Sequence, residues 1–242
     1  MKVLAFNSSP SKDKGRTALI LNPFLEGMKE AGADVELFYT KDLNIKPCQG
    51  EFTCWIKTPG QCFQKDDMQM LYPKLNADVI VFASPVYVDG INGPLKNLID
   101  RCIPVAEPFI ELRDGHCRHP LRDKTGTKTG KVVLVSTCGF WEMDNFEPAV
   151  FHMKAACRNM NRTFAGALLR PCAHVYQTIL AMGGPVKDIP EAAKEAGRQL
   201  VKDGEMSEKT LNIISRELIT LDSFLKMANQ MFKQAIEAAK KS

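Results

Sequence analysis

The stretch LAFNSSPSKDKGRTALIL, residues 4–21, decides the fold. An apolar run typical of a buried strand ends at a turn of small residues, a polar loop follows, and apolar residues then return at helical spacing. Hydroxyl groups, amides near a helix N-terminus and a fixed positive charge in such a loop suit a dianionic phosphate. The side chains that offer these groups are Ser8, Ser9, Ser11, Arg16 and Thr17. The stretch therefore predicts a strand, a phosphate loop and the start of a helix.

The loop matches neither of the two best-known glycine-rich phosphate motifs. It has a single glycine, Gly15, so both the Walker A pattern and the dinucleotide fingerprint are absent. An ordinary strand-to-helix connection rich in turn-forming residues explains the same letters. The loop alone leaves both interpretations open, and the other motifs have to decide between them.

Length and composition exclude several classes of protein. The 242 residues, 45% of them hydrophobic, suffice for one domain with a full core, or for one domain and an appendage. The net charge of +4 comes from 32 basic and 28 acidic residues that are dispersed, so we expect no nucleic-acid partner. No apolar segment approaches the ~18 to 20 residues of a membrane span, and MKVLAF reads as a strand rather than a signal peptide. We therefore expect a cytoplasmic protein with no membrane partner.

Strongly apolar strand patterns alternate with helical ones in the first part of the chain. The strand patterns cover residues 3–6, 35–39, 79–84 and 131–137. The helical patterns cover residues 17–31, 66–76 and 93–102. This alternation indicates a parallel sheet with helices on both faces, in which ligands bind outside the carboxyl ends of the strands. Three polar segments follow such strand ends, namely residues 8–17, 84–90 and 137–140, so we expect them to converge.

The second of these segments, SPVYVDG at residues 84–90, has a chemistry of its own. Pro85 and Gly90 in this segment, with Gly93 and Pro94 just after it, predict a flat and rigid ledge. Tyr87 adds an aromatic edge. Such a ledge can hold a planar heteroaromatic ring, and Gly139 on the facing segment allows close backbone approach. A half-buried aromatic at a strand end explains Tyr87 equally simply.

The phosphate loop and the ledge together resemble a known family. SSPSKDKGRT resembles the phosphate loop of the flavodoxin-like NAD(P)H-dependent FMN reductases, and SPVYVDG followed by LKNLIDR resembles their ring-binding loop and helix. The resemblance covers roughly residues 1–140 well and the remainder only in general layout. It implies an α/β fold, a flavodoxin-like three-layer sandwich with a parallel sheet, plus C-terminal helices.

The resemblance also implies which residues hold FMN. Those expected at its phosphate are Ser9, Ser11, Arg16 and Thr17. Those expected around its isoalloxazine ring are Pro85, Val86, Tyr87, Gly90, Thr137, Cys138, Gly139 and Phe140. Two positions depart from the family pattern, because Ser8 stands where glycine is usual and Ser11 where arginine is usual. Arg16 is therefore expected to carry more of the phosphate charge.

The activity implied is that of an FMN-dependent oxidoreductase that takes hydride from NAD(P)H. Electrons then pass to a small-molecule acceptor, such as a quinone, a flavin or an aromatic compound, or to a redox protein. The cofactor carries the chemistry, so no catalytic residue is assigned. An FMN electron-transfer protein without nicotinamide activity is the alternative, and a flavin-free phosphate-ester binder is a further one. The resemblance also implies a homodimer or homotetramer, whereas nothing in the residues selects NADH over NADPH.

A cysteine-containing insert, PCQGEFTCWIKTPGQC at residues 47–62, looks like that of the iron–sulfur flavoprotein branch. On the four-cysteine pattern of that branch fall Cys48, Glu51, Cys54 and Cys62. A four-iron cluster takes four thiolates, so the glutamate makes an iron–sulfur cluster doubtful. A zinc site of three cysteines and Glu51 is chemically allowed. The interpretation we favour is a loop with free thiols.

The chain divides near residue 185. We expect a flavodoxin-like FMN-binding domain at residues 1–185, with the insert at 47–62, and a C-terminal helical extension at 186–242. After a turn-rich linker, residues 191–204 and 207–241 predict two helices. A stripe at helical spacing runs along the second, formed by Leu211, Ile214, Leu218, Leu221, Leu225 and Met231. We expect this stripe to pack on the core or across a dimer, and residues 104–130 to form a solvated surface loop.

Overall fold

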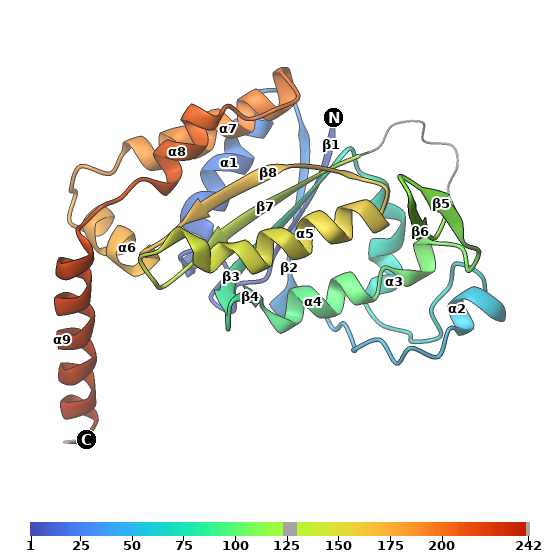
Figure 1. Cartoon of the computed structure of the whole chain (residues 1–242), viewed down its shortest axis with the longest axis horizontal. Coiled ribbons are helices and arrows are strands. Elements are labelled where there is room, and N and C mark those ends of the chain that lie inside the picture. The colour runs from blue at the N-terminus through green and yellow to red at the C-terminus, as the bar shows by residue number, and fades with distance from the viewer. Residues whose placement is uncertain (123–129, 241–242) are drawn as a thin grey trace.

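The structure, a computed structural model, describes residues 1–122 and 130–240. A sheet with the strand order β2-β1-β3-β7-β8 forms its centre, and neighbouring strands along this path are parallel (Figure 1). The strands are β1 (Lys2–Asn7), β2 (Asp34–Tyr39), β3 (Val79–Tyr87), β7 (Lys131–Thr137) and β8 (Thr163–Arg170). The short β4 (Gly90–Ile91) pairs antiparallel with the end of β3. The central strands are apolar on both faces because helices cover both.

Helices cover each face of the sheet and complete three layers (Figure 1). On one face lie α1 (Ala18–Glu30), α6 (Ala173–Ala181), α7 (Asp188–Lys202) and α8 (Glu208–Ser215). On the other lie α3 (Met68–Leu71), α4 (Gly93–Asp100) and α5 (Glu147–Asn159). Outside these layers are α2 (Thr53–Ile56) and α9 (Leu221–Ala239). Turns of 3₁₀ helix cover Lys12–Lys14, Thr40–Asp42, Tyr72–Asn76, Ile103–Val105 and Met143–Phe146.

The close contact between α1 and α7 depends on a glycine. A Cβ atom added to Gly27 of α1 would lie 1.8 Å from the carbonyl oxygen of Lys194 on α7. Ile189, Ala193 and Leu200 of α7 are buried in the same core cluster as Phe24 of α1. Of the C-terminal helices, α7 and α8 therefore pack into the core of the sheet, whereas α9 projects from it. The expected division into two domains at residue 186 stays a prediction.

The expectation of one helix over residues 207–241 was wrong, because the chain is extended between α8 and α9. The buried guanidinium of Arg170 donates hydrogen bonds to the carbonyl oxygens of Ile214 at 2.7 Å and Arg216 at 2.9 Å. These carbonyls are thus bound by Arg170, and Arg216 turns to an extended ψ of 148°. A new helix starts at Thr220, whose side chain accepts from the amide of Ser223. The apolar stripe is divided as a result: Ile214 lies in the core, whereas Leu225 is exposed on α9.

The expected surface loop at residues 104–130 contains a small hairpin, formed by β5 (Glu111–Arg113) and β6 (His116–Arg118). Residues 123–129 of this expectation lie outside the described residues. In the described part of the chain, no helix combines the length and apolar character that a membrane crossing requires.

Candidate functional site

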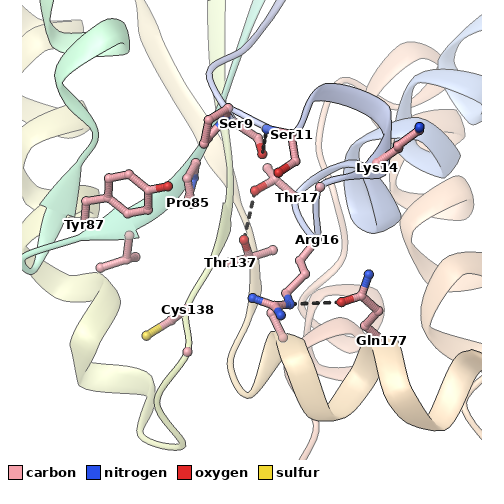
Figure 2. A pocket seen from close by; sticks show the side chains of 15 residues that line it. Ser9, Ser11, Lys14, Arg16, Thr17, Pro85, Tyr87, Thr137, Cys138 and Gln177 are labelled. Carbon is pink, nitrogen blue, oxygen red and sulfur yellow. Dashed lines mark hydrogen bonds between the residues drawn. The ribbon is translucent and has the colours of Figure 1, made fainter. Parts of the chain in front are cut away.

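A cavity of about 400 Å³ opens where the carboxyl ends of β1, β3 and β7 meet (Figure 2). Three of its walls are the segments after these strands, which converge as predicted from the sequence. Helix α6 supplies a fourth. The residues that line it are Ser9, Pro10, Ser11, Lys14, Gly15, Arg16, Thr17, Pro85, Val86, Tyr87, Thr137, Cys138, Gly139, Ala173 and Gln177.

Ten of the twelve residues expected at FMN line this cavity, and Gly90 and Phe140 do not. Gly90 lies in β4 and pairs with Tyr87 across the hairpin turn. The side chain of Phe140 is 61% exposed, and its carbonyl oxygen accepts a hydrogen bond from the amide of Cys172. Both residues therefore shape the segments around the cavity from outside its lining. Five further lining residues were not predicted from the sequence: Pro10, Lys14, Gly15, Ala173 and Gln177.

The loop after β1 is held by its own hydrogen bonds. The amide and the hydroxyl of Ser8 both donate to the carbonyl oxygen of Ala83, at 2.8 and 2.9 Å, so this side chain points into the sheet and away from the cavity. The amide of Ser9 donates to Oδ1 of Asn7 at 2.9 Å. A Cβ atom at Gly15 would lie 2.3 Å from Oγ of Ser9, so the loop closes this tightly only with glycine there. The result is a preformed loop whose remaining hydroxyls face the cavity.

Positively charged groups lie at the end of the cavity that the loop after β1 borders. Nε of Arg16 donates to Oε1 of Gln177 on α6 at 3.0 Å, which fixes the plane of the guanidinium. Among the described residues its Nη groups bond to no protein atom, so an anion can take them. Lys14 adds a second cation, and the N-terminus of the 13-residue α1 adds the positive end of a helix dipole. Together these groups have the charge and the hydrogen-bond donors that a phosphate requires.

The hydroxyl groups of Thr17 and Thr137 lie 2.9 Å apart and join the loop after β1 to the end of β7. Figure 2 shows this contact between the loop on one side and Tyr87 and Cys138 on the other. A buried network completes the junction, since Nδ2 of Asn92 donates to the carbonyl oxygen of Ser8 at 2.6 Å and the Ser136 hydroxyl donates to that of Ser84 at 2.8 Å. The three strand ends are thereby locked in register around the cavity.

The ledge after β3 ends in a tight turn. Val88 and Asp89 have positive φ values of 46° and 61°, as a two-residue hairpin requires of both central residues. Tyr87, at the base of this turn, is 51% exposed and borders the cavity. An aromatic side chain in this position can lie against a planar ring.

The thiol of Cys138 is buried, and its Sγ accepts a hydrogen bond from the amide of Phe140. Burial raises the pKa of Cys138, so the group stays a neutral thiol near pH 7. Its backbone positions α6, because the carbonyl oxygen of Cys138 accepts from the amide of Ala173 at 2.9 Å. This contact brings Gln177 to the cavity.

The cysteine insert forms a separate and much smaller hollow of about 10 Å³, lined among others by Cys48, Glu51, Cys54, Cys62 and Arg101. In the described part of the chain no group of three or more Cys, His, Asp or Glu side chains could hold a metal ion. Oε2 of Glu51 accepts from the amide of Thr53 at 2.7 Å, so this carboxylate is bound to the start of α2. Burial raises the pKa of Cys54, and the nearby Cys62, Glu51 and Cys48 raise it further. The insert as it stands does not fit a four-thiolate cluster.

A parallel α/β sandwich with a phosphate loop after its first strand, and with its cavity at the carboxyl ends of the strands, is a flavodoxin-like nucleotide-binding protein. The chain belongs to the NADPH-dependent FMN reductase family, whose model matches residues 1–161. The family and fold class expected from the sequence, and FMN as the family's cofactor, are thereby confirmed.

Curated relatives agree with this family. An iron–sulfur flavoprotein from Archaeoglobus fulgidus is 40% identical over 102 residues, which are 42% of this chain and 48% of that protein. One from Methanocaldococcus jannaschii is 35% identical over 115 residues, which are 47% of this chain and 58% of that protein. The chain thus spans about half the length of the curated relatives it matches.

Solved structures confirm the fold. An FMN-dependent NADH-azoreductase from Bacillus anthracis superimposes with a TM-score of 0.58 at 16% identity, over 83% of this chain and 99% of that one. An NAD(P)H:quinone oxidoreductase from Methanothermobacter marburgensis gives 0.53 at 18% identity, over 83% and 96% of the two chains.

Proposed function

We propose that this chain is an FMN-dependent oxidoreductase that takes a hydride from NAD(P)H and passes electrons to an acceptor. The observation that carries the proposal is the cavity itself, where a preformed phosphate loop, two cations and an open aromatic ledge meet at the carboxyl ends of three strands. Family membership supports the same cofactor. When bound, FMN supplies the hydride and electron chemistry.

The residues of the cavity would divide the work of binding between its two ends. The hydroxyls of Ser9, Ser11 and Thr17 and the guanidinium of Arg16 would hold the phosphate, and the backbone of residues 85–87 and 137–139 would border the ring. Gln177 would orient Arg16 through their hydrogen bond. These assignments rest on the lining of the cavity and on the family resemblance.

The chain's own part is to bind and to orient. No carboxylate or histidine lines the cavity within residues 1–122 and 130–240, and the thiol of Cys138 is neutral. Because no group there is poised to transfer a proton, we assign no catalytic acid or base. We expect single substitutions to act on the affinity for FMN before they act on the chemical step.

We propose a small-molecule acceptor, such as a quinone, a flavin or an aromatic compound, or else a redox protein, and a cytoplasmic homo-oligomer. Quinone and azo compounds appear in the names of the solved proteins with this fold. The electron-transfer alternative draws on the names of the iron–sulfur flavoproteins. The insert weakens it, because its side chains do not fit the cluster that a two-centre electron relay would use.

The test is an anaerobic titration of the purified full chain with FMN, followed by NADH or NADPH. We expect FMN to bind in a 1:1 ratio and its visible absorption to bleach with one of the nicotinamides. Binding without bleaching by either would support the electron-transfer alternative. A chain that does not bind FMN at all would overturn the proposal.

A further inference from the structure

Helix α9 projects from the body of the molecule and is exposed to solvent over most of its length (Figure 1). Phe224, near its start, is its one buried residue and packs with Cys172 and Val175 at the start of α6. Ala228, one turn further along, is partly buried against the same cluster. All residues from 229 to 240 are exposed. Most of the stability of a helix in a protein comes from the packing of its apolar face, and among the described residues α9 packs on the body only near its start. The rest of this helix therefore calls for a partner.

One side of α9 is apolar. Leu225, Phe232 and Ile236 are 47%, 61% and 56% exposed, and within the described residues nothing beyond the root of the helix covers them. Met227 and Met231, which are 39% and 45% exposed, widen this apolar side. The side chains of Lys226, Gln230, Lys233, Gln234 and Glu237 lie on the opposite side at helical spacing. Monomeric proteins seldom expose a continuous apolar stripe of this kind, and such stripes mark interaction surfaces.

The spacing of the stripe indicates that the partner is another helix. The seam, as we call it, is formed by Leu221, Leu225, Ala228, Phe232, Ala235 and Ala239. These residues are separated by four, three, four, three and four positions, which is the heptad spacing of helices that pack along a common line. We propose that the seam of α9 packs antiparallel against the seam of α9 in a second copy of this chain.

The seam complements itself in size only when the two helices run in opposite directions. Its intervals read the same from either end, so an antiparallel pair centred on residue 230 sets Leu221 opposite Ala239 of the second copy. In the same way Leu225 faces Ala235, and Ala228 faces Phe232. Every large side chain of the seam meets an alanine, which allows dense packing between the two helices. A parallel pair in register would instead set Phe232 against Phe232 and alanine against alanine.

Charge and geometry favour the same arrangement. Antiparallel pairing brings Asp222 near Lys240 of the second copy and opposes the two helix dipoles. The three alanines of the seam allow close approach of a helix, whereas a lipid surface would favour bulkier side chains and a more uniformly basic polar face. A second copy is therefore the occupant that the seam fits.

The pairing would reach back to the cavity. At 1.5 Å per residue α9 is about 28 Å long. In an antiparallel pair its C-terminal end lies beside the root of the other α9, where Phe224 packs on α6. Helix α6 in turn supplies Ala173 and Gln177 to the cavity. The inference rests on the homo-oligomer part of the proposed function and is independent of its redox chemistry.

Sedimentation velocity of the full chain tests the pairing. We expect the wild type at twice its chain mass of 27.0 kDa. Leu225→Glu combined with Phe232→Glu places charge in the seam, and we expect the dimer dissociation constant to rise at least about 100-fold. Gln230→Glu combined with Gln234→Glu makes the same change of charge away from the seam and should leave the dimer intact.

Mixing experiments test the direction. We expect Leu225→Glu and Ala235→Lys each to weaken the dimer, and an equimolar mixture of the two to restore it, because the two positions face each other only in the antiparallel pair. Restoration by Leu225→Glu with Leu225→Lys instead would show a parallel pair and overturn the proposal. The far-UV circular dichroism and FMN affinity of each variant show that its body is folded.

Two further outcomes would also overturn it: a wild type that stays monomeric at tens of micromolar, or a seam variant that stays dimeric. A third experiment adds vesicles of anionic phospholipid. A monomeric wild type that sediments with the vesicles, and seam variants that do not, would show a membrane-binding helix instead. Loss of FMN binding in an intact dimer would count against the proposed function alone.

Discussion

At the scale of single residues, Arg16 is the cation that the geometry points at the cavity. We expect Arg16→Ala to weaken FMN binding by about 1.5 to 3 kcal/mol, the contribution of a hydrogen bond to a charged group, which is roughly a 10- to 150-fold rise in Kd. Fluorescence titration with FMN measures it. Lys12→Ala is the matched control, because Lys12 belongs to the same loop but pairs with Asp42 and does not line the cavity. Equal affinities of the two variants would remove Arg16 from the site.

His174, also a single residue, couples the root of α9 to pH. Its ring lies 5.8 Å from that of Phe224, and its Nε2 is buried without a partner among the described residues. Burial lowers the pKa of His174 and the charge of Arg16 lowers it further, so the folded chain holds the ring neutral. As the pH falls below the ordinary value of 6.5, the unfolded chain binds the proton first and stability is lost.

We therefore expect the free energy of unfolding to fall between pH 7 and 5 in the wild type, and to fall less steeply in His174→Gln. Urea unfolding at several pH values measures both slopes. The variant loses packing as well, so the slope decides and not the absolute stability. His116→Gln, a change of an exposed histidine on β6, serves as the control. Identical slopes in wild type and His174→Gln would contradict the assignment.

At the scale of elements, one buried ion pair fastens the cysteine insert to α4. The side chains of Arg101 and Asp66 are 1% and 0% exposed, and Nη1 and Nη2 of Arg101 reach the carboxylate at 2.6 and 3.0 Å. Nη1 also donates to the carbonyl oxygen of Lys46, and Nη2 to Sγ of Cys62. Burial alone would raise the pKa of Asp66, but the hydrogen bonds from Arg101 and two amides hold it below its usual range. The carboxylate is thus ionised, and its stabilisation is lost only as the pH falls below about 3.8.

We expect Asp66→Asn to destabilise the fold by about 3 to 5 kcal/mol, because it leaves the guanidinium of Arg101 buried without its countercharge. Urea unfolding at neutral pH measures the loss. The matched control is Asp100→Asn, which breaks the exposed pair with Lys96 on the same helix and should cost under about 1 kcal/mol. If Asp66→Asn lowered the free energy of unfolding no more than Asp100→Asn does, the buried pair would not stabilise the fold.

The insert itself gives the second prediction at this scale, on metal content. We expect the wild type, reconstituted anaerobically with iron and sulfide, to bind FMN but no stoichiometric iron, because Glu51 stands in place of a thiolate and is held by the amide of Thr53. Iron and acid-labile sulfide per FMN measure this. Glu51→Cys completes a four-thiolate set and is the comparison in which uptake is expected. About four irons in the wild type would show that the carboxylate suffices.

For the whole molecule, the sequence predicts the elements whose signals are local. The apolar runs of β1, β3 and β7 and the loop from Ser8 to Thr17 predicted the sheet and most of the cavity lining. Strand β8 was not predicted, because Gly166 and a break in register against β7 interrupt its apolar pattern. Helix α6 begins after Cys172 at a left-handed φ of 48°, without a capping side chain. The start of α6 therefore has no local signal in the sequence. The position of Gln177 at the cavity depends on tertiary contacts of this helix, so it could not be predicted.

We also expect the chain to unfold as one unit up to α8. Because α7 packs into the core against α1, we expect a single urea transition, the same by flavin fluorescence and by far-UV circular dichroism, apart from a small contribution of α9. Gly27→Ala forces a Cβ atom against the carbonyl oxygen of Lys194, and we expect it to lower the free energy of unfolding by about 1 to 3 kcal/mol in both signals. Gly93→Ala, whose Cβ atom would meet no neighbour within 4 Å, is the control. If α7 instead detached in a separate, earlier transition while the flavin stayed bound, the division of the chain near residue 186 would be a true domain boundary.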